Sequence, residues 1–392
     1  MDRPGSRIHS LDGLRALSVS LVVLGHLAKT TGAPRWLDST GPYAHFGVRV
    51  FFVISGFIIT HLLLQEHQQT SAIDLGAFYA RRFFRIFPAA YVFMACMTVL
   101  LWPTLTAADI LSSFAYISNY RSERPWVFGH LWSLAVEEQF YLLWPLALVL
   151  WFKMRVRIAL ATLIAAPLVR ALLFALHYKE GAYLWFPSLA DALATGCLLA
   201  ILKPSLEQWL RNWDPFARRW LVLPAVTIAL VQFGQTTLLG RATNFVYYVA
   251  VLPAIHLGIA LTLFHCLHRR YWLLNWRPVA WIGSLSYSIY LWQQWCLIPA
   301  SATPWHRFPM NLGLMLGLGC LSCYLVERPI LLLRNRPVVR ARQRAEVQLN
   351  TLSDATIIPQ PESHSKPPSQ SPLHAPACAT LVSKHIEDDG AC

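Results

Sequence analysis

Three ionisable residues share one face of the first apolar segment, which begins Leu11-Asp-Gly-Leu-Arg15 and ends Leu24-Gly-His26. At about 100° a residue, the steps from Arg15 to His26 end about 20° past three full turns and span roughly 16 Å. Asp12 falls within about 40° of the same line. An imidazole can serve as a general base and a guanidinium can bind an anion, so this face is a candidate site. The alternative interpretation is a snorkelling Arg15 and a His26 among the headgroups.

Arg82 and Arg85 lie one turn apart at the start of a later apolar segment. Guanidinium groups bind phosphate oxygens bidentately, and coenzyme A carries a diphosphate and a 3′-phosphate. This pair therefore predicts a phosphate-binding site, which a cytoplasmic donor such as acetyl-CoA would need. The alternative is that both residues are ordinary basic flanks of a membrane helix.

A third candidate site opens the segment that starts at His130, because Ser133 and Glu137 follow at helical spacing and share its face. An acid inside a membrane helix costs at least about 2.5–3.5 kcal/mol at the bilayer centre, so it is a functional candidate by default. Glu137 is expected to orient the imidazole or to bind sugar hydroxyls. A purely structural pairing of the acid with Arg170 is the alternative.

Weaker signals come from polar residues in the remaining apolar segments. Tyr287 and Tyr290 supply hydroxyl groups that can bind a substrate, although tyrosine also forms interfacial belts. Asp191 and Arg170 can neutralise each other within the membrane. Cys320 has a second cysteine three residues later but no other pair near it in sequence, so no metal site is predicted.

The elements that carry these residues are expected to be membrane helices. The chain is 55% hydrophobic and 14% charged, against about 45–50% and 25% for soluble proteins. Apolar blocks recur at the length of about 17–25 residues that crosses a bilayer. We expect an all-α, polytopic membrane protein with about ten transmembrane helices: Leu14–Ala28, Phe46–Leu64, Phe83–Leu101, Leu131–Phe152, Ile158–Leu176, Phe186–Leu202, Trp220–Phe233, Phe245–Leu267, Pro278–Pro299 and Met310–Leu333.

Charge patterning predicts the orientation of these helices. Basic residues favour one set of loops about two to one, which places both termini in the cytoplasm and the protein in the inner (plasma) membrane. Residues 1–335 are expected to form the transmembrane domain, whose first helix is retained rather than cleaved. Residues 336–392 are expected to form a disordered cytoplasmic tail. Topology and membrane lipids account for the net charge of +13, so no nucleic-acid partner is predicted.

Several short motifs together resemble the membrane-bound acyltransferase-3 family, whose members O-acylate sugars of lipopolysaccharide, exopolysaccharide, peptidoglycan and other glycoconjugates. They occur in family order over about four fifths of the chain. The motifs are Leu11-Asp-Gly-Leu-Arg-Ala through His26, Phe51-Phe-Val-Ile-Ser-Gly-Phe57, Arg82-x-x-Arg85 followed by Pro88, Trp132-Ser-Leu-x-x-Glu137, Tyr287-x-x-Tyr290-Leu-Trp and Val326-Glu-Arg-Pro329.

The resemblance implies that His26 is the catalytic histidine, with Arg15 as its companion and Arg82 and Arg85 as the donor-binding pair. It also implies a carbohydrate or glycolipid acceptor, and a stand-alone form without the hydrolase-like domain that some members carry. Two positions depart from the family pattern: Arg49 stands where many members have an acid, and Gln293 where many have histidine. The sequence leaves open whether His26 acts as a base or accepts the acyl group itself. Other classes, a transporter of a glycan or small molecule or a scaffold, would need no acyl donor.

Overall fold

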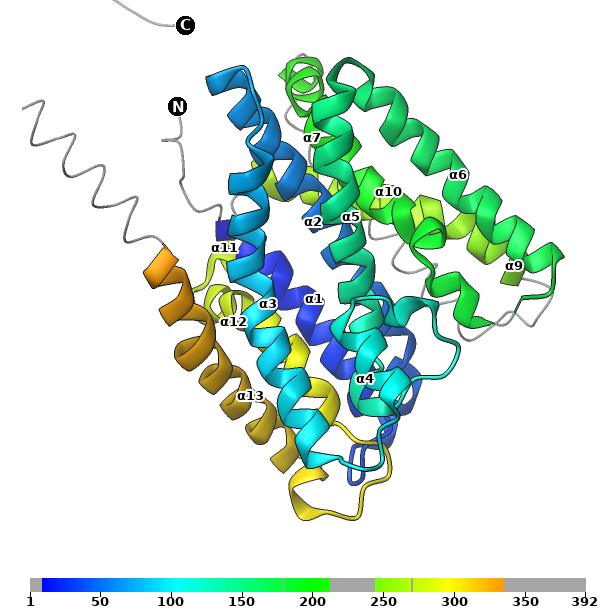
Figure 1. Ribbon diagram of the computed structural model, residues 1–392, viewed down its shortest axis with the longest axis vertical. Coiled ribbons are helices and arrows are strands. Elements are labelled where there is room, and N and C mark those ends of the chain that lie inside the picture. The colour runs from blue at the N-terminus through cyan, green and yellow to red at the C-terminus, as the bar shows by residue number, and fades with distance from the viewer. Residues whose placement is uncertain (1–8, 179, 212–243, 269–270, 335–392) are drawn as a thin grey trace, which may run out of the picture. The chain divides into compact units, whose positions relative to one another are not determined.

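The computed structural model describes residues 9–178, 180–211, 244–268 and 271–334, and this part of the chain is helical without any strand (Figure 1). The predicted all-α class is therefore confirmed. The helices are α1 (His9–Leu27), α2 (Pro42–Thr70), α3 (Leu75–Leu100), α4 (Ala107–Phe114), α5 (Leu131–Leu150), α6 (Arg155–Ala175), α7 (Phe186–Arg211), α9 (Asn244–Val246), α10 (Leu252–His268), α11 (Trp272–Asn275), α12 (Arg277–Cys296) and α13 (Met310–Ser322).

Eight segments of the described residues are long and apolar enough to cross a bilayer, so the chain is a multi-pass membrane protein. The block expected at Pro278–Pro299 forms α12, which is not among the eight because its serine, tyrosine and glutamine side chains lower its hydropathy. The block at Trp220–Phe233 and the tail at 336–392 lie outside the described residues. The total of ten helices and the cytoplasmic termini stay predictions.

Glycines bring α2 and α7 into direct backbone contact. A Cβ added to Gly56 of α2 would lie 2.0 Å from the carbonyl oxygen of Leu193, and one added to Gly196 of α7 would lie 2.1 Å from that of Val53. Small residues allow this approach in membranes, where helices associate through van der Waals packing rather than the hydrophobic effect. The two helices therefore form a rigid pair that fixes one wall of the bundle.

Glycine contacts also hold α1 against α2 and α12. A Cβ on Gly283 of α12 would lie 1.9 Å from the carbonyl oxygen of Asp12, and one on Gly25 would lie 2.6 Å from the backbone nitrogen of Ala44 in α2. Contacts between α1 and both α2 and α12 run along their lengths. Figure 1 shows α1 crossing the middle of the helical unit, with α13 at one edge and α6 at the opposite edge. The face of α1 that carries the candidate residues is thus enclosed.

We expect Gly283→Val to destabilise the bundle by about 1–3 kcal/mol or more, because the added methyl groups meet backbone that cannot move aside. Gly313→Val in α13 is the matched control, since a Cβ there meets nothing within 4 Å. The melting temperatures of the two purified variants in detergent measure the difference. Equal melting temperatures would show that α1 and α12 can move apart at Gly283 without loss of stability.

A fully buried ion pair ties α6 to α7. Arg170 donates through Nη1 and Nη2 to the two carboxylate oxygens of Asp191, at 3.0 and 2.7 Å, and both side chains are 0% exposed. The remaining guanidinium donors reach the carbonyl oxygens of Ser188 and of Tyr248, the latter at 2.6 Å. The expected mutual neutralisation of Arg170 and Asp191 is confirmed, and this arginine is therefore a structural group.

Candidate active site

His26 lies at the C-terminal end of α1, and its ring is held by residues from two other elements. Its Nδ1 lies 2.8 Å from Oε1 of Gln293 in α12, and its ring packs edge-on against Trp126, with centroids 5.6 Å apart. Gln293 Nε2 donates to Oε1 of Gln294 at 3.1 Å, which leaves Gln293 Oε1 as the acceptor. The hydrogen-bond network thus assigns the proton of His26 to Nδ1. The lone pair of Nε2 remains available as a base.

Gln293 occupies one of the two positions that depart from the family pattern, and it is fully buried against the histidine. A glutamine oxygen can fix the orientation and tautomer of an imidazole, as a carboxylate does in other histidine sites. The sequence did not identify this partner, because 267 residues separate the two side chains along the chain. The structure makes Gln293 the residue that positions His26.

We expect Gln293→Ala to lower kcat about 10–100-fold, the range seen when a histidine loses its orienting partner, with little change in KM for either substrate. Gln293→Glu keeps an acceptor oxygen in place and should recover a large part of the lost kcat. Steady-state kinetics of both variants check this. A change confined to KM would place Gln293 in substrate binding instead.

A cavity of about 870 Å³ opens beside His26, within the usual size range of small-molecule sites. The described residues that line it are rich in aromatic and basic side chains and include no aspartate or glutamate. The aromatic members are Phe52, Trp126, Trp132, Tyr183, Tyr247, Tyr248 and Tyr290, and the basic ones are His26, His45, His130, Arg49, Arg124 and Arg170. Aromatic faces pack well against the apolar faces of sugar rings, so the cavity, hereafter the His26 cavity, suits a carbohydrate.

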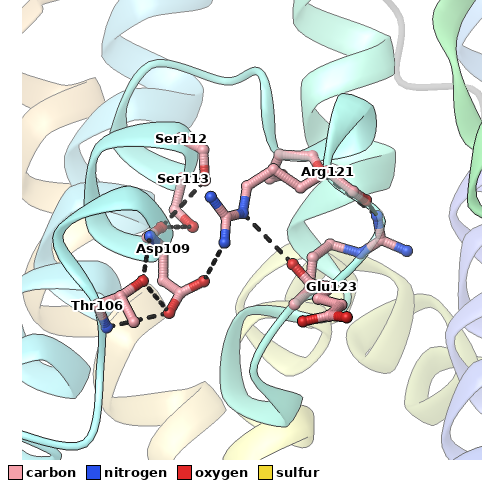
Figure 2. A network of polar contacts seen from close by, with 8 residues as sticks. Thr106, Asp109, Ser112, Ser113, Arg121 and Glu123 are labelled. Carbon is pink, nitrogen blue, oxygen red and sulfur yellow. Dashed lines mark hydrogen bonds and ion pairs between the residues drawn. The ribbon is translucent and has the colours of Figure 1, made fainter.

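Arg124 and Trp126 line the cavity from the loop before α5. Figure 2 shows the polar contacts that fold the preceding part of this loop. Asp109 caps α4 through a capping box with Thr106, and its Oδ1 lies 3.0 Å from Nη2 of Arg121. Arg121 Nε donates to the carbonyl oxygen of Glu123 at 3.3 Å, as Figure 2 shows. Burial, with a smaller contribution from Arg121, lowers the pKa of Arg124, although a guanidinium stays charged at neutral pH.

Arg15, Arg82 and Arg85 form a second group, hereafter the arginine cluster, contributed by α1 and α3. Each charge acts on the others, and the Arg82 guanidinium lies 4.1 Å from the ring centroid of Tyr141. Within the described residues, none of the three makes a hydrogen bond or an ion pair, and Nε of Arg15 and Nε of Arg82 are buried without a partner. Converging guanidinium groups with unused donors suit the oxygens of phosphate groups.

Two carboxylates lie near the arginine cluster without bonding to it. Glu137 accepts a hydrogen bond from Ser55 Oγ at 2.7 Å, and Glu327 accepts one from Ser288. Both act electrostatically on Arg15. The structure therefore places Glu137 with the arginines, whereas Gln293 occupies the position beside the imidazole that we expected for this acid.

The other predicted site residues divide between the two groups. Tyr290 lines the His26 cavity and its hydroxyl contacts Ser133. Tyr287 donates to the carbonyl oxygen of Ile86, next to the arginine cluster, at 2.6 Å. Asp12 is buried at the start of α1 and acts on the charge of Arg15. Neither Asp12 nor Tyr287 lines the cavity.

Only a short stretch separates the cavity from the arginine cluster. Ser133, in contact with the cavity residue Tyr290, lies one helical turn before Glu137 on α5, which corresponds to about 6 Å. His26 and Arg15 are roughly 16 Å apart along α1 by the same geometry. The pantetheine arm of coenzyme A is long enough to cover that separation. None of the three arginines lines the cavity, so a reaction that uses both groups requires the donor to span this distance.

Sequence spacing missed several cavity residues because each comes from a different element. His45 lies on α2 and Arg124 lies in the loop before α5. Periodicity along one segment shows only that His130 shares a face with Glu137. Basic residues are scarce in the predicted outer loops, but Arg121 lies in the same loop as Arg124, so this signal does not distinguish Arg124.

Comparison with known proteins gives the same family as the motifs in the sequence. Residues 8–328 match the family model of acyltransferase 3, described as an acyltransferase domain. The chain is 30% identical to peptidoglycan O-acetyltransferase OatA of Listeria monocytogenes, over 73% of this chain and 48% of that protein. It is 30% identical to O-acetyltransferase OatA of Staphylococcus aureus (72% and 49%) and 28% identical to putative peptidoglycan O-acetyltransferase YrhL of Bacillus subtilis (82% and 55%).

No solved structure matches the chain. The chain spans about half the length of the curated relatives that it matches. The family model, by contrast, covers about four fifths of this chain and includes both the His26 cavity and the arginine cluster. The protein therefore belongs to the acyltransferase-3 family.

Proposed function

We propose that this protein is an O-acetyltransferase of the plasma membrane that moves an acetyl group from acetyl-CoA to a hydroxyl of a cell-surface glycan. The observation that supports it most strongly is a positioned imidazole at a carbohydrate-sized cavity, together with three clustered guanidinium groups that make no hydrogen bond or ion pair among the described residues. The names of the relatives favour a cell-wall carbohydrate such as peptidoglycan as the acceptor. Lipopolysaccharide and exopolysaccharide are the other acceptors that fit the same chemistry.

The arginine cluster is the proposed donor site. Arg15, Arg82 and Arg85 would hold the phosphate groups of acetyl-CoA, because the three charges lie within electrostatic reach of one another and the buried Nε atoms of Arg15 and Arg82 have no hydrogen-bond partner among the described residues. Glu137 and Glu327 reduce the repulsion among the three arginines, since both lie within electrostatic reach of them. The thioester would then extend toward Tyr290 and the His26 cavity.

His26 would act as the general base. Its Nε2 takes the proton of the acceptor hydroxyl, the hydroxyl oxygen bonds to the acetyl carbon, and the carbon–sulfur bond breaks. The departing sulfur receives the proton from His26 and leaves as the free thiol. Gln293 keeps the proton on Nδ1 and holds Nε2 toward the cavity.

The proposed orientation follows from the predicted topology. Both termini in the cytoplasm place the arginine end of α1 at the cytoplasmic side, where acetyl-CoA is found, and the His26 end at the outer side. The donor and the acceptor would then approach from opposite faces of the membrane. The acetyl group alone would cross from one site to the other.

The test uses purified full-length protein with acetyl-CoA and glycan fragments from the host envelope. We expect thiol release that depends on the glycan, and one added acetyl group for each modified fragment in the mass spectrum. A transporter or a scaffold would release no thiol. Thiol release at the same rate without glycan would contradict transfer to a carbohydrate.

A further inference from the structure

We propose that the His26 cavity selects an acidic sugar, and that Arg124 binds its carboxylate while the hydroxyl to be acetylated faces His26. This inference rests on the proposed function and specifies its acceptor class. It follows from the charge of the cavity, from the partners of Arg124 and from the state of His130.

The charge of the cavity favours an anion. Its described lining carries three arginines and three histidines and no carboxylate. One of the arginines, Arg170, is neutralised by Asp191, and Arg49 donates to the hydroxyl of Tyr247 at 3.0 Å. A neutral polysaccharide could form hydrogen bonds with such a lining but would gain no charge–charge attraction from it. An anionic sugar would be attracted into the cavity and held there.

Arg124 is the cation best placed to bind the anion. Its Nη1 donates to the carbonyl oxygens of Ser118, at 3.4 Å, and of Arg121, and both partners are uncharged. No described carboxylate lies within ion-pair distance of its guanidinium, and Arg121 is the one charged group among the described residues that acts on it. A half-buried guanidinium with carbonyl partners retains donors for a planar carboxylate, which it can bind bidentately.

His130 supplies the second, independent observation. Its side chain is 3% exposed and lines the cavity, and at most one ring nitrogen, the one beside the backbone of Leu291, has a hydrogen-bond partner among the described residues. Leaving a buried polar group unpaired costs about 1–3 kcal/mol, so such groups usually have a ligand or another partner. The ring packs edge-on between Phe93 and Tyr290, with centroids 5.4 Å from each, which fixes its direction. A sugar hydroxyl or carboxylate oxygen in the cavity would give the ring of His130 a hydrogen-bond partner.

The test measures binding with two matched probes. One is a tetrasaccharide that alternates N-acetylglucosamine and glucuronic acid, and the other is the same molecule with each carboxylate converted to a primary amide. Isothermal titration with the full-length protein in detergent should show at least about tenfold tighter binding of the acidic form. Arg124→Gln should abolish that preference. Arg307→Gln, which removes an exposed arginine outside the cavity lining, should retain it.

Equal affinity for the two probes, failure of the acidic probe to bind, or a preference that survives Arg124→Gln would each overturn the inference. Acetyl transfer to both probes, measured in parallel, separates it from the proposed function. Transfer without any preference for the acid would contradict the acidic acceptor and leave the acetyltransferase proposal intact. Preference in binding without any transfer would contradict the acetyltransferase proposal alone.

Discussion

Replacing His26 by alanine is expected to reduce acetyl transfer to the glycan by about 10²–10⁴-fold, the usual contribution of a general base. The variant loses Nε2, which is the atom that the Gln293 hydrogen bond leaves free to accept a proton. Folding should be preserved, because the imidazole is half-buried at a helix end and makes one hydrogen bond with another side chain. Initial rates at saturating acetyl-CoA, with membrane insertion checked by protein yield, measure the effect.

His61→Ala is the matched control for this experiment. His61 lies on α2 and stacks on Phe57, with ring centroids 5.5 Å apart, and it does not line the cavity. Its replacement should leave the rate near that of the unchanged protein. If His26→Ala keeps a comparable rate, His26 is not the base and the proposed chemistry is wrong.

The second large effect is expected from replacing Arg82 and Arg85 together by glutamine. Each guanidinium that is removed takes away a charge-assisted hydrogen bond to phosphate, so KM for acetyl-CoA should rise about 10–100-fold. KM for the acceptor should change little, because neither arginine lines the His26 cavity. Varying each substrate at a fixed excess of the other separates the two constants.

Arg81→Gln provides the comparison for the donor site. Arg81 is the immediate neighbour of Arg82 but pairs with Glu66 at 3.1 Å in an exposed position, outside the arginine cluster. Its loss should leave KM for acetyl-CoA unchanged. An increase of the same size in Arg81→Gln and in the double variant would indicate a general effect of positive charge, and no increase in the double variant would refute the phosphate site.

The sequence predicted most helices from their hydrophobic blocks, and the differences lie at polar ends. α3 begins at Leu75 rather than at Phe83, because Asp74 caps its first turn and the residues between are too polar to register as membrane helix. α2 continues to Thr70, beyond the expected Leu64, because its last residues are also too polar to be recognised as membrane helix. Hydropathy detects the part of a helix that contacts lipid, whereas backbone hydrogen bonding continues into water until a residue ends it.

Site residues were predictable where one helix carries two of them. The spacing from Arg82 to Arg85 and from Ser133 to Glu137 is a property of a single helix, and periodicity reveals it. The pairing of His26 with Gln293 depends instead on how α1 packs on α12. That packing is set by a backbone contact at Gly283, which no pattern along one segment reveals.

The central claim is that acetyl-CoA binds at the arginine end of the bundle and the glycan binds at the His26 end. Proteoliposomes with the protein in one known orientation test it most directly, with radiolabelled acetyl-CoA confined to the side of the arginine cluster and an impermeant glycan fragment on the side of His26. The account predicts that label appears on the glycan across an intact bilayer, and that it disappears with His26→Ala. Label that appears only when both substrates share one side would contradict the account.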